Sequence, residues 1–280
     1  MPTEVLRYAA FTSGGRGGNP AGVVLDAEGL DEQAMQSIAA DLGYSETAFL
    51  FPRAQEPNVY DVRYFAPGQE VPFCGHATIA SGVALVERRP AEELVFHTPA
   101  GLVTVSTRRT DDGLVAELTS VSPRIRPADP HLVGAVLDAL GWRFDDLDPD
   151  YPTSLANAGS EHLVLVTRSH ARLADLHYDY DALAPLMREH GLVTVMLVWP
   201  ESRKLYHARN PFAGSGVVED PATGAAAAAF GAYLRDLHKI GATAELTILQ
   251  GDEIGRPSRI EVSVQRGEPG VRVRGAASRL

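Results

Sequence analysis

Two segments of the chain have the composition of helices that are enclosed by protein on every side. One reads HATIASGVALVE from His76 to Glu87, and the other reads ATGAAAAAFGAYL from Ala222 to Leu234. Both are rich in small residues and nearly apolar all round, whereas a helix on a protein surface keeps one polar face. We therefore predict two buried helices, over about 77–87 and about 221–239, each surrounded by other elements of the fold.

Short strands flank both helices in the sequence. We expect them at 5–11, 21–25, 47–51, 59–65, 94–96, 102–107 and 114–118 in the first half, and at 162–167, 192–199, 205–209, 245–250, 259–264 and 271–274 in the second. Amphipathic helices are predicted after Asp31, at 132–140 and at 180–189. The strands do not alternate regularly with helices, which disfavours a doubly wound parallel sheet.

The segments before the two buried helices are alike, which indicates a weak internal duplication. Arg63-Tyr64-Phe65-Ala66 precedes the first helix, and Arg209-Asn210-Pro211-Phe212-Ala213 precedes the second. We interpret the chain as an α+β fold of two pseudo-symmetric lobes, each a curved sheet wrapped around a central buried helix. The proline-rich stretch 120–130 is the expected connection. The lobes would then be 1–122 and 123–280, with the last strand, about 270–280, able to pack back onto the first lobe.

Composition excludes several classes of protein. The 280 residues carry a net charge of −11, whereas a nucleic-acid-binding protein needs a basic face. The longest apolar stretch, 192–199, is far shorter than the ~20 residues of a membrane span, and the first residues do not resemble a signal peptide. Cys74 is the only cysteine, which fits a cytoplasmic protein without disulfides. The two lysines, Lys204 and Lys239, lie in contexts that do not suit a pyridoxal Schiff base.

Three titratable residues lie where structural elements begin. His76 opens the first buried helix, Asp220 precedes the second in Glu219-Asp220-Pro221, and Glu46 begins an apolar strand. Helix N-termini attract anions, so two such ends facing each other would bind an anionic substrate. Each carboxylate also has a structural alternative. An Asp before a Pro is typical of an ordinary N-cap, and Glu46 could be a surface residue at the edge of a strand.

Four ordered motifs give the chain a resemblance to a known family. They are Gly18-Asn19-Pro20-Ala21-Gly22-Val23-Val24, Ser45-Glu46-Thr47-Ala48-Phe49, the segment from Arg63-Tyr64-Phe65 to Cys74-Gly75-His76-Ala77-Thr78, and Glu219-Asp220-Pro221-Ala222-Thr223-Gly224, with Gly159, His162, Gly251 and Arg256 fitting the same pattern. Together they resemble the phenazine-biosynthesis PhzF-like family, which is related to diaminopimelate epimerase. The resemblance spans nearly the whole chain.

The resemblance implies a diaminopimelate epimerase-like fold with an active site between two lobes. It also implies an isomerase that transfers a proton on a small carboxylate without a cofactor. By position, Glu46 resembles the principal proton shuttle, with His76 and Asp220 as its catalytic partners. Gly75, Gly224 and Ala225 would present backbone N–H groups to the substrate, and Asn19 corresponds to a substrate-facing asparagine.

The chemistry of these residues suits that role. A group that removes and returns a proton works best with a pKa near neutrality. Burial and the charge of Asp220 should raise the pKa of Glu46. The helix N-terminus should keep His76 neutral, because the helix dipole disfavours imidazolium.

Two departures from the family pattern concern the substrate site. Relatives often carry Ser where this chain has Ala225, so one hydroxyl contact to the substrate would be missing. The epimerase branch uses two thiols, and Cys74 alone excludes a two-thiol racemase.

No metal, nucleotide or phosphate-loop motif is present in the sequence, and we expect no cofactor and no metal. We expect a homodimer that takes a small anionic metabolite, with no nucleic-acid or membrane partner. A dehydratase, a one-base racemase or epimerase acting on a hydroxy- or amino-acid, and a non-catalytic ligand-binding protein remain open as alternatives.

Overall fold

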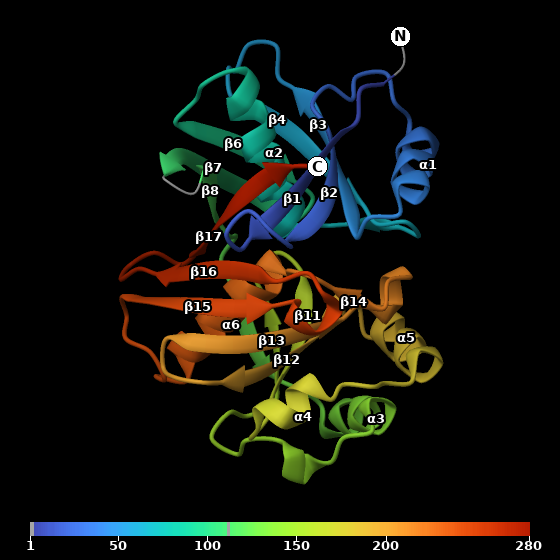
Figure 1. Cartoon of the computed structure of the whole chain (residues 1–280), viewed down its shortest axis with the longest axis vertical. Coiled ribbons are helices and arrows are strands. Elements are labelled where there is room, and N and C mark those ends of the chain that lie inside the picture. The colour runs from blue at the N-terminus through green and yellow to red at the C-terminus, as the bar shows by residue number, and fades with distance from the viewer. Residues whose placement is uncertain (1–2, 111–112) are drawn as a thin grey trace.

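The computed structural model describes residues 3–110 and 113–280. Its helices are α1 (Glu32–Leu42), α2 (Gly75–Arg88), α3 (Pro130–Leu140), α4 (His170–Ala174), α5 (Tyr180–Glu189) and α6 (Gly224–Asp236). Its strands are β1 (Leu6–Thr12), β2 (Asn19–Val24), β3 (Glu46–Pro52), β4 (Val59–Phe65), β5 (Glu70–Val71), β6 (Glu93–Thr98), β7 (Gly101–Thr110), β8 (Gly113–Thr119), β9 (Arg124–Pro127), β10 (Ser154–Asn157), β11 (Glu161–Val166), β12 (Thr194–Pro200), β13 (Leu205–Pro211), β14 (Glu219–Asp220), β15 (Ala244–Gln250), β16 (Ser258–Val264) and β17 (Val271–Arg279). Figure 1 shows two stacked parts, one around α2 and the other around α6.

The strands of the two parts pair in the same order. β1, β2, β3, β4, β6, β7 and β8 form successive pairs that are antiparallel, parallel, antiparallel, parallel, antiparallel and antiparallel. β10, β11, β12, β13, β15, β16 and β17 repeat this order of pairings. Each run also has a two-residue strand, β5 or β14, paired antiparallel with β4 or β13. The repeated order agrees with the weak duplication seen in the sequence.

The C-terminal strand closes the first run of strands on itself. β17 pairs antiparallel with β8 on one side and with β1 on the other, where Tyr8 lies opposite Arg279. The start of the same strand pairs with β16 in the second run. The prediction of a mixed helix-and-sheet fold is therefore confirmed, and its sheet is closed.

Burial follows the position of each strand relative to the helices. β17 and β16 alternate buried and more exposed residues, as expected of strands with one face toward the core. β2 is buried at every residue and β3 at its first five, because a second apolar cluster packs on their outer face. That cluster includes Met35 and Ala39 of α1, together with Phe49 of β3.

The helices α2 and α6 form the centre of the largest apolar core. Both are buried continuously over eleven residues, from Gly75 to Leu85 and from Gly224 to Leu234. Gly82 and Gly231 lie at matching places in the two helices, and a Cβ at either would come within 2.8 Å of a valine methyl, on Val105 or Val262. Small residues therefore let each sheet approach its helix closely. None of the helices that the structure describes is both long and apolar enough to cross a membrane.

Several boundaries differ from the sequence prediction. The second buried helix begins at Gly224 with Thr223 as its N-cap, so the interpretation of Asp220 as an N-cap is wrong. The stretch 120–130, expected to be a plain connection, contains β9, which pairs with β10. The strands β5, β10 and β14 were not predicted, because segments of two to four residues carry no measurable periodicity.

Candidate active site

The N-termini of α2 and α6 meet at two glycines. A Cβ added to Gly75 would lie 2.8 Å from the Cα of Gly224 and 2.9 Å from the nitrogen of Ala225. The N-cap residues Cys74 and Thr223 make no side-chain capping hydrogen bond, so neither cap neutralises its helix end. Two partially positive helix ends in contact favour an anion between them.

A small cavity of about 10 Å³ lies beside this contact, which is roughly the space of one water molecule. Its lining residues come from both runs of strands and both buried helices: Glu46, Phe73, Cys74, Gly75, His76, Ser160, His162, Val193, Thr194, Phe212, Asp220, Thr223, Gly224 and Ala225. The structure thus brings together Glu46, His76 and Asp220, which are far apart in the sequence. The expected backbone donors Gly75, Gly224 and Ala225 line the same space.

Glu46 is the first residue of β3 and is only 5% exposed, so it is not a surface residue at the edge of a strand. Its Oε2 has no hydrogen-bond partner among the residues described and lies 3.5 Å from Nε2 of His76. Burial, and next the negative charge of Asp220, raise the pKa of the Glu46 carboxyl well above its ordinary value. Glu46 can therefore hold a proton at a pH where an exposed glutamate would be ionised.

His76 is the second residue of α2 and faces Glu46. Nδ2 of Asn19 lies 3.0 Å from Nδ1 of His76. If one amide hydrogen points to Nδ1, the neutral ring carries its proton on Nε2, which lies 3.5 Å from Oε2 of Glu46. Burial lowers the pKa of His76 to about 3. The neutral state expected from the helix dipole is thus found, but burial is its main cause.

Asp220 lies in β14, opposite Asn210 of β13. Its carboxylate accepts hydrogen bonds from Nδ2 of Asn19 at 2.6 Å and from Oγ1 of Thr223 at 2.7 Å. Burial raises the pKa of Asp220 to about 6, and the hydrogen bonds from Thr223, Ser45 and Asn19 act in the opposite direction. Nε2 of Gln250 donates to the Asp220 backbone carbonyl at 2.7 Å and fixes this segment.

Asn19 links the other polar residues. Its amide nitrogen lies within hydrogen-bond distance of His76, Asp220 and the carbonyl of Ala222. Asn19 is fully buried and is not among the residues that line the cavity. In this structure its amide group lies between His76 and Asp220.

Glu46, Cys74 and His76 also form a group whose ligand atoms lie within 4.8 Å of one another, close enough to hold a metal ion. A metal would require the Cys74 thiolate. Burial, and next the charge of Glu46, raise the pKa of the Cys74 thiol well above its ordinary value. Nδ1 of His76 already faces the Asn19 amide. Without a cation beside them, all three groups are therefore neutral and keep their protons.

Part of the cavity lining was not assigned to the candidate site from the sequence. His162 and Thr194 are paired residues on the parallel strands β11 and β12, and both line the cavity. The Gly159 to His162 motif marked the place in the sequence. A buried histidine in an apolar strand nevertheless gives no signal of what it faces.

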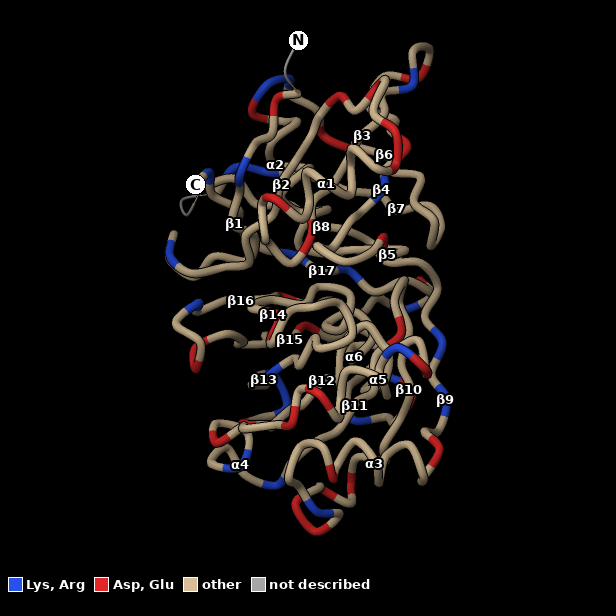
Figure 2. Tube along the Cα trace, turned by 90° about the vertical axis from the view of Figure 1, so that its right-hand side faces the viewer, with Lys and Arg blue, Asp and Glu red and all other residues tan. Residues whose placement is uncertain are grey.

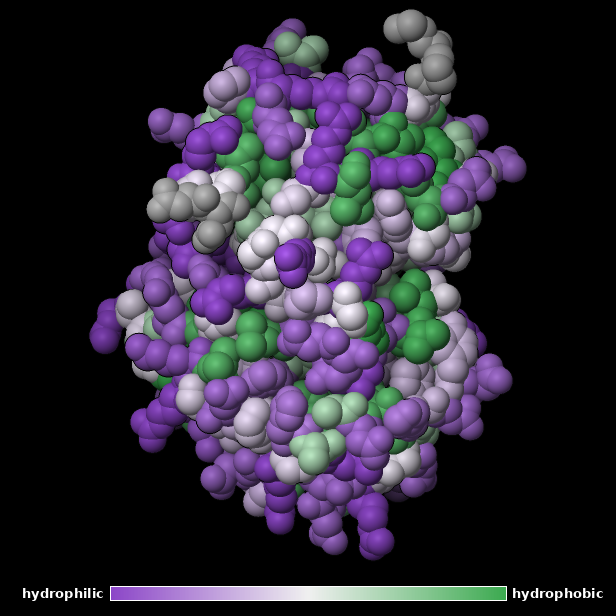
Figure 3. Space-filling view, viewed as in Figure 1, coloured by the Kyte–Doolittle hydropathy of each residue, from purple (hydrophilic) through white to green (hydrophobic). Residues whose placement is uncertain are grey.

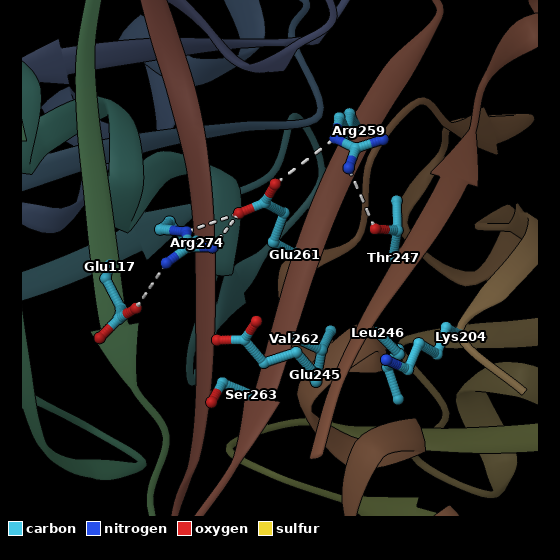
Figure 4. A pocket seen from close by; sticks show the side chains of 10 residues that line it. All are labelled: Glu117, Lys204, Glu245, Leu246, Thr247, Arg259, Glu261, Val262, Ser263 and Arg274. Atoms are coloured by element: carbon cyan, nitrogen blue, oxygen red, sulfur yellow. Dashed lines mark hydrogen bonds and ion pairs between the residues drawn. The ribbon is translucent and has the colours of Figure 1, made fainter. Parts of the chain in front are cut away.

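Other surface features lie away from this site. A groove over β15, β16 and β17 is lined by charged side chains (Figure 4). Its arginines, however, pair with its own glutamates: Arg274 with Glu261 and Glu117, and Arg259 with Glu261. Acidic and basic residues are interspersed along the trace in Figure 2, and the face in Figure 3 shows only small, separate hydrophobic areas.

Known proteins resemble this chain along almost all of its length. The family model for phenazine biosynthesis-like proteins, PhzC-PhzF, matches residues 8–280. The uncharacterized isomerase YfhB of Bacillus subtilis is 34% identical in an alignment 285 residues long. This alignment includes 96% of this chain and 93% of that protein. The trans-2,3-dihydro-3-hydroxyanthranilate isomerase of Pseudomonas aeruginosa is 30% identical, with 90% of this chain and 86% of that protein covered.

Solved structures show the same likeness. The crystal structure of a PhzF-family phenazine biosynthesis protein from Bacillus anthracis matches with a TM-score of 0.83 and 27% identity, covering 99% of this chain and 96% of that one.

Proposed function

Because this chain belongs to the phenazine biosynthesis-like PhzC-PhzF family, and proteins similar to it are named isomerases, we propose that it moves a proton between carbon atoms of a small carboxylate. In this proposal Glu46 carries the proton and no cofactor takes part. The observation that carries the proposal is the state of Glu46. It is a buried carboxyl with a raised pKa, and one oxygen has no hydrogen-bond partner among the described residues that face the cavity.

We interpret the two runs of strands as the two lobes of a diaminopimelate epimerase-like fold, residues 1–122 and 123–280. The cavity is lined from both sides of that boundary. A space of about 10 Å³ is too small for any metabolite, so a substrate enters only when the two walls separate. Closure around the substrate would then exclude water from the reacting atoms.

The substrate carboxylate would bind at the two helix N-termini. The backbone N–H groups of Gly75, Gly224 and Ala225 lie beside the cavity, and no side-chain cap uses these helix ends. Backbone donors need no deprotonation and carry no net charge. They can therefore hold an anion while leaving the neighbouring carboxyl groups free to titrate.

Glu46 would remove a proton from one carbon and return it to another. Such a group must accept and release a proton with similar ease, which a raised pKa provides. Its Oε2 lies 3.5 Å from Nε2 of the neutral His76. His76 would donate a hydrogen bond from this nitrogen, either to Glu46 or to a substrate oxygen. Asp220 contributes its negative charge, which raises the pKa of Glu46 further.

The test uses trans-2,3-dihydro-3-hydroxyanthranilate, the compound named for the Pseudomonas relative, in deuterated water. We expect a shifted double bond with one solvent deuterium on the product carbon. Glu46→Gln should abolish this exchange while keeping the fold, since general acid–base groups contribute typically ~10²–10⁴-fold. Glu245→Gln, an exposed carboxyl on β15, is the matched control and should react normally.

The same spectra separate the alternatives left open by the sequence. Label without net change indicates racemisation, and loss of water indicates dehydration. Binding without any label indicates a non-catalytic relative. Near-normal exchange by Glu46→Gln would remove Glu46 from the mechanism.

A further inference from the structure

A chain of three buried polar side chains reaches the cavity that Glu46 lines. Nδ1 of His162 lies 2.9 Å from Oγ1 of Thr194, and Oγ1 of Thr194 donates to Oδ1 of Asn210 at 3.0 Å. None of the three is more than 1% exposed. His162 and Thr194 line the cavity, and Asn210 lies behind them, next to Asp220 across the β13–β14 pair.

The orientation of the Asn210 amide decides where the histidine carries its proton. With Oδ1 toward Thr194, as in this structure, the Thr194 hydroxyl gives its one hydrogen to that oxygen, and the Thr194 oxygen accepts from His162 Nδ1. The neutral ring then has a bare lone pair on Nε2. Burial lowers the pKa of His162 to about 3, which keeps the ring neutral at physiological pH.

Nε2 of His162 has no hydrogen-bond partner among the residues described, although the atom is buried. Buried polar atoms without a partner are uncommon, and each one costs free energy that a hydrogen-bonding ligand would recover. The cavity is the place from which such a ligand would come, because His162 lines it.

The repeated sheet order shows that Glu46 and Thr194 occupy matching places in the two runs of strands. Phe49 of β3 lies opposite Arg63, and Leu197 of β12 lies opposite Arg209. Glu46 lies three positions before Phe49, and Thr194 lies three positions before Leu197. Each is the first residue of its strand. Where one half places a proton-carrying carboxyl, the other therefore places a hydroxyl that orients a histidine.

We propose that Nε2 of His162 accepts a hydrogen bond from a hydroxyl or amino group of the substrate. This inference rests on the proposed function and narrows its substrate to carboxylates that carry such a donor. A carboxylate without one would leave Nε2 unpaired inside the closed site. His162 is then a recognition residue that lines the same cavity as the proton carrier.

The first experiment measures the tautomer of His162 directly. Long-range proton–nitrogen correlation spectra of the full-length protein distinguish a ring protonated on Nδ1 from one protonated on Nε2. The signals of His162 are identified by their loss in His162→Asn. We expect the Nδ1-protonated form throughout pH 5.5–8. A proton on Nε2 would overturn the proposal, because that nitrogen could then only donate.

The second experiment measures binding by calorimetry with four ring compounds: benzoate, anthranilate, 3-hydroxybenzoate and 3-hydroxyanthranilate. They share a carboxylate and differ in the amino and hydroxyl groups. We expect at least one donor group to tighten binding over benzoate by about three- to tenfold, the range of one neutral hydrogen bond. Comparison of anthranilate with 3-hydroxybenzoate shows whether His162 accepts its hydrogen bond from the amino group or from the hydroxyl group.

Two variants assign the gain to one atom. His162→Asn keeps an amide near the position of Nδ1, where it can still bond to Thr194, but removes the group at Nε2. His162→Gln places an amide oxygen near Nε2. The gain from the donor group should disappear in His162→Asn and return at least partly in His162→Gln.

The outcomes separate the two proposals. If benzoate does not bind, the carboxylate site itself fails, and the role of His162 falls with it. If benzoate binds but the donor-bearing compounds bind no more tightly, or if their gain survives in His162→Asn, the role of His162 alone is overturned.

Discussion

The contact between the ends of α2 and α6 makes Gly75→Ala the most informative single substitution. The new methyl group would lie 2.8 Å from the Gly224 Cα and 2.9 Å from the Ala225 nitrogen, both of them backbone atoms. An ordinary contact begins at 3.4 Å, so the helix ends must move apart. Overpacking of this kind costs about 1–3 kcal/mol. Gly75 is the first residue of α2, so the mid-helix preference for alanine returns little of this cost. We expect a loss of about 1–3 kcal/mol of unfolding free energy.

Gly134→Ala in α3 is the control, because nothing lies within 4 Å of its added Cβ. This variant should gain ~0.5–1 kcal/mol instead. Urea unfolding of both variants, with turnover measured in parallel, separates the two effects. Displaced backbone donors in Gly75→Ala should also lower kcat/KM, by up to about 10²-fold for a displacement near 1 Å. A Gly75→Ala protein as stable and as active as the wild type would refute the close helix contact and the anion site built on it.

Three further predictions concern the carboxylates and their neighbours. The folded-state pKa of Asp220, about 6 against an ordinary 3.8, favours the protonated form, so stability falls as pH rises between these values, by about 3 kcal/mol in total. Asp220→Asn should remove this loss; a variant whose urea midpoint differs from wild type equally at pH 3.5 and pH 7 would contradict it. Ala225→Ser should keep the same reaction and change affinity by no more than about tenfold, the upper range of one hydrogen bond; activity gained from none would show that the natural protein only binds. Turnover should survive a chelator, and activity restored by one specific divalent ion would show instead that Glu46, Cys74 and His76 hold a metal.

The sequence predicts the two buried helices well, because small apolar residues on every face leave few other places for a helix. The prediction of Glu46, His76 and Asp220 as one group came from motif order and family resemblance, and the structure places all three around one cavity. Their roles remain predictions. The local structure around Asp220 was predicted less well from the sequence. Asp-Pro is also an N-cap signature, whereas the structure holds the residue in a two-residue strand through its pairing with Asn210 and its contacts with Asn19 and Gln250.

The contacts among His162, Thr194 and Asn210 could not be predicted, because they depend on which strands are neighbours and in which register. His162 faces Thr194 across parallel strands, and Thr194 meets Asn210 on the next strand. Each is an unremarkable polar residue within an apolar segment. Periodicity shows that such a segment is buried, but it carries no information about which strands are neighbours.

The position of β17 has a consequence for how the chain is made. A growing chain leaves the ribosome from its N-terminus, yet β1 and β8 receive their shared partner only when β17, up to Arg279, has been synthesised. Until then both strands keep unpaired edges, which invite pairing with other chains. Because the contacts that join the two ends span almost the entire chain, folding should be slow. A nascent chain is therefore most prone to aggregation just before β17 is synthesised, when chaperones would protect it most.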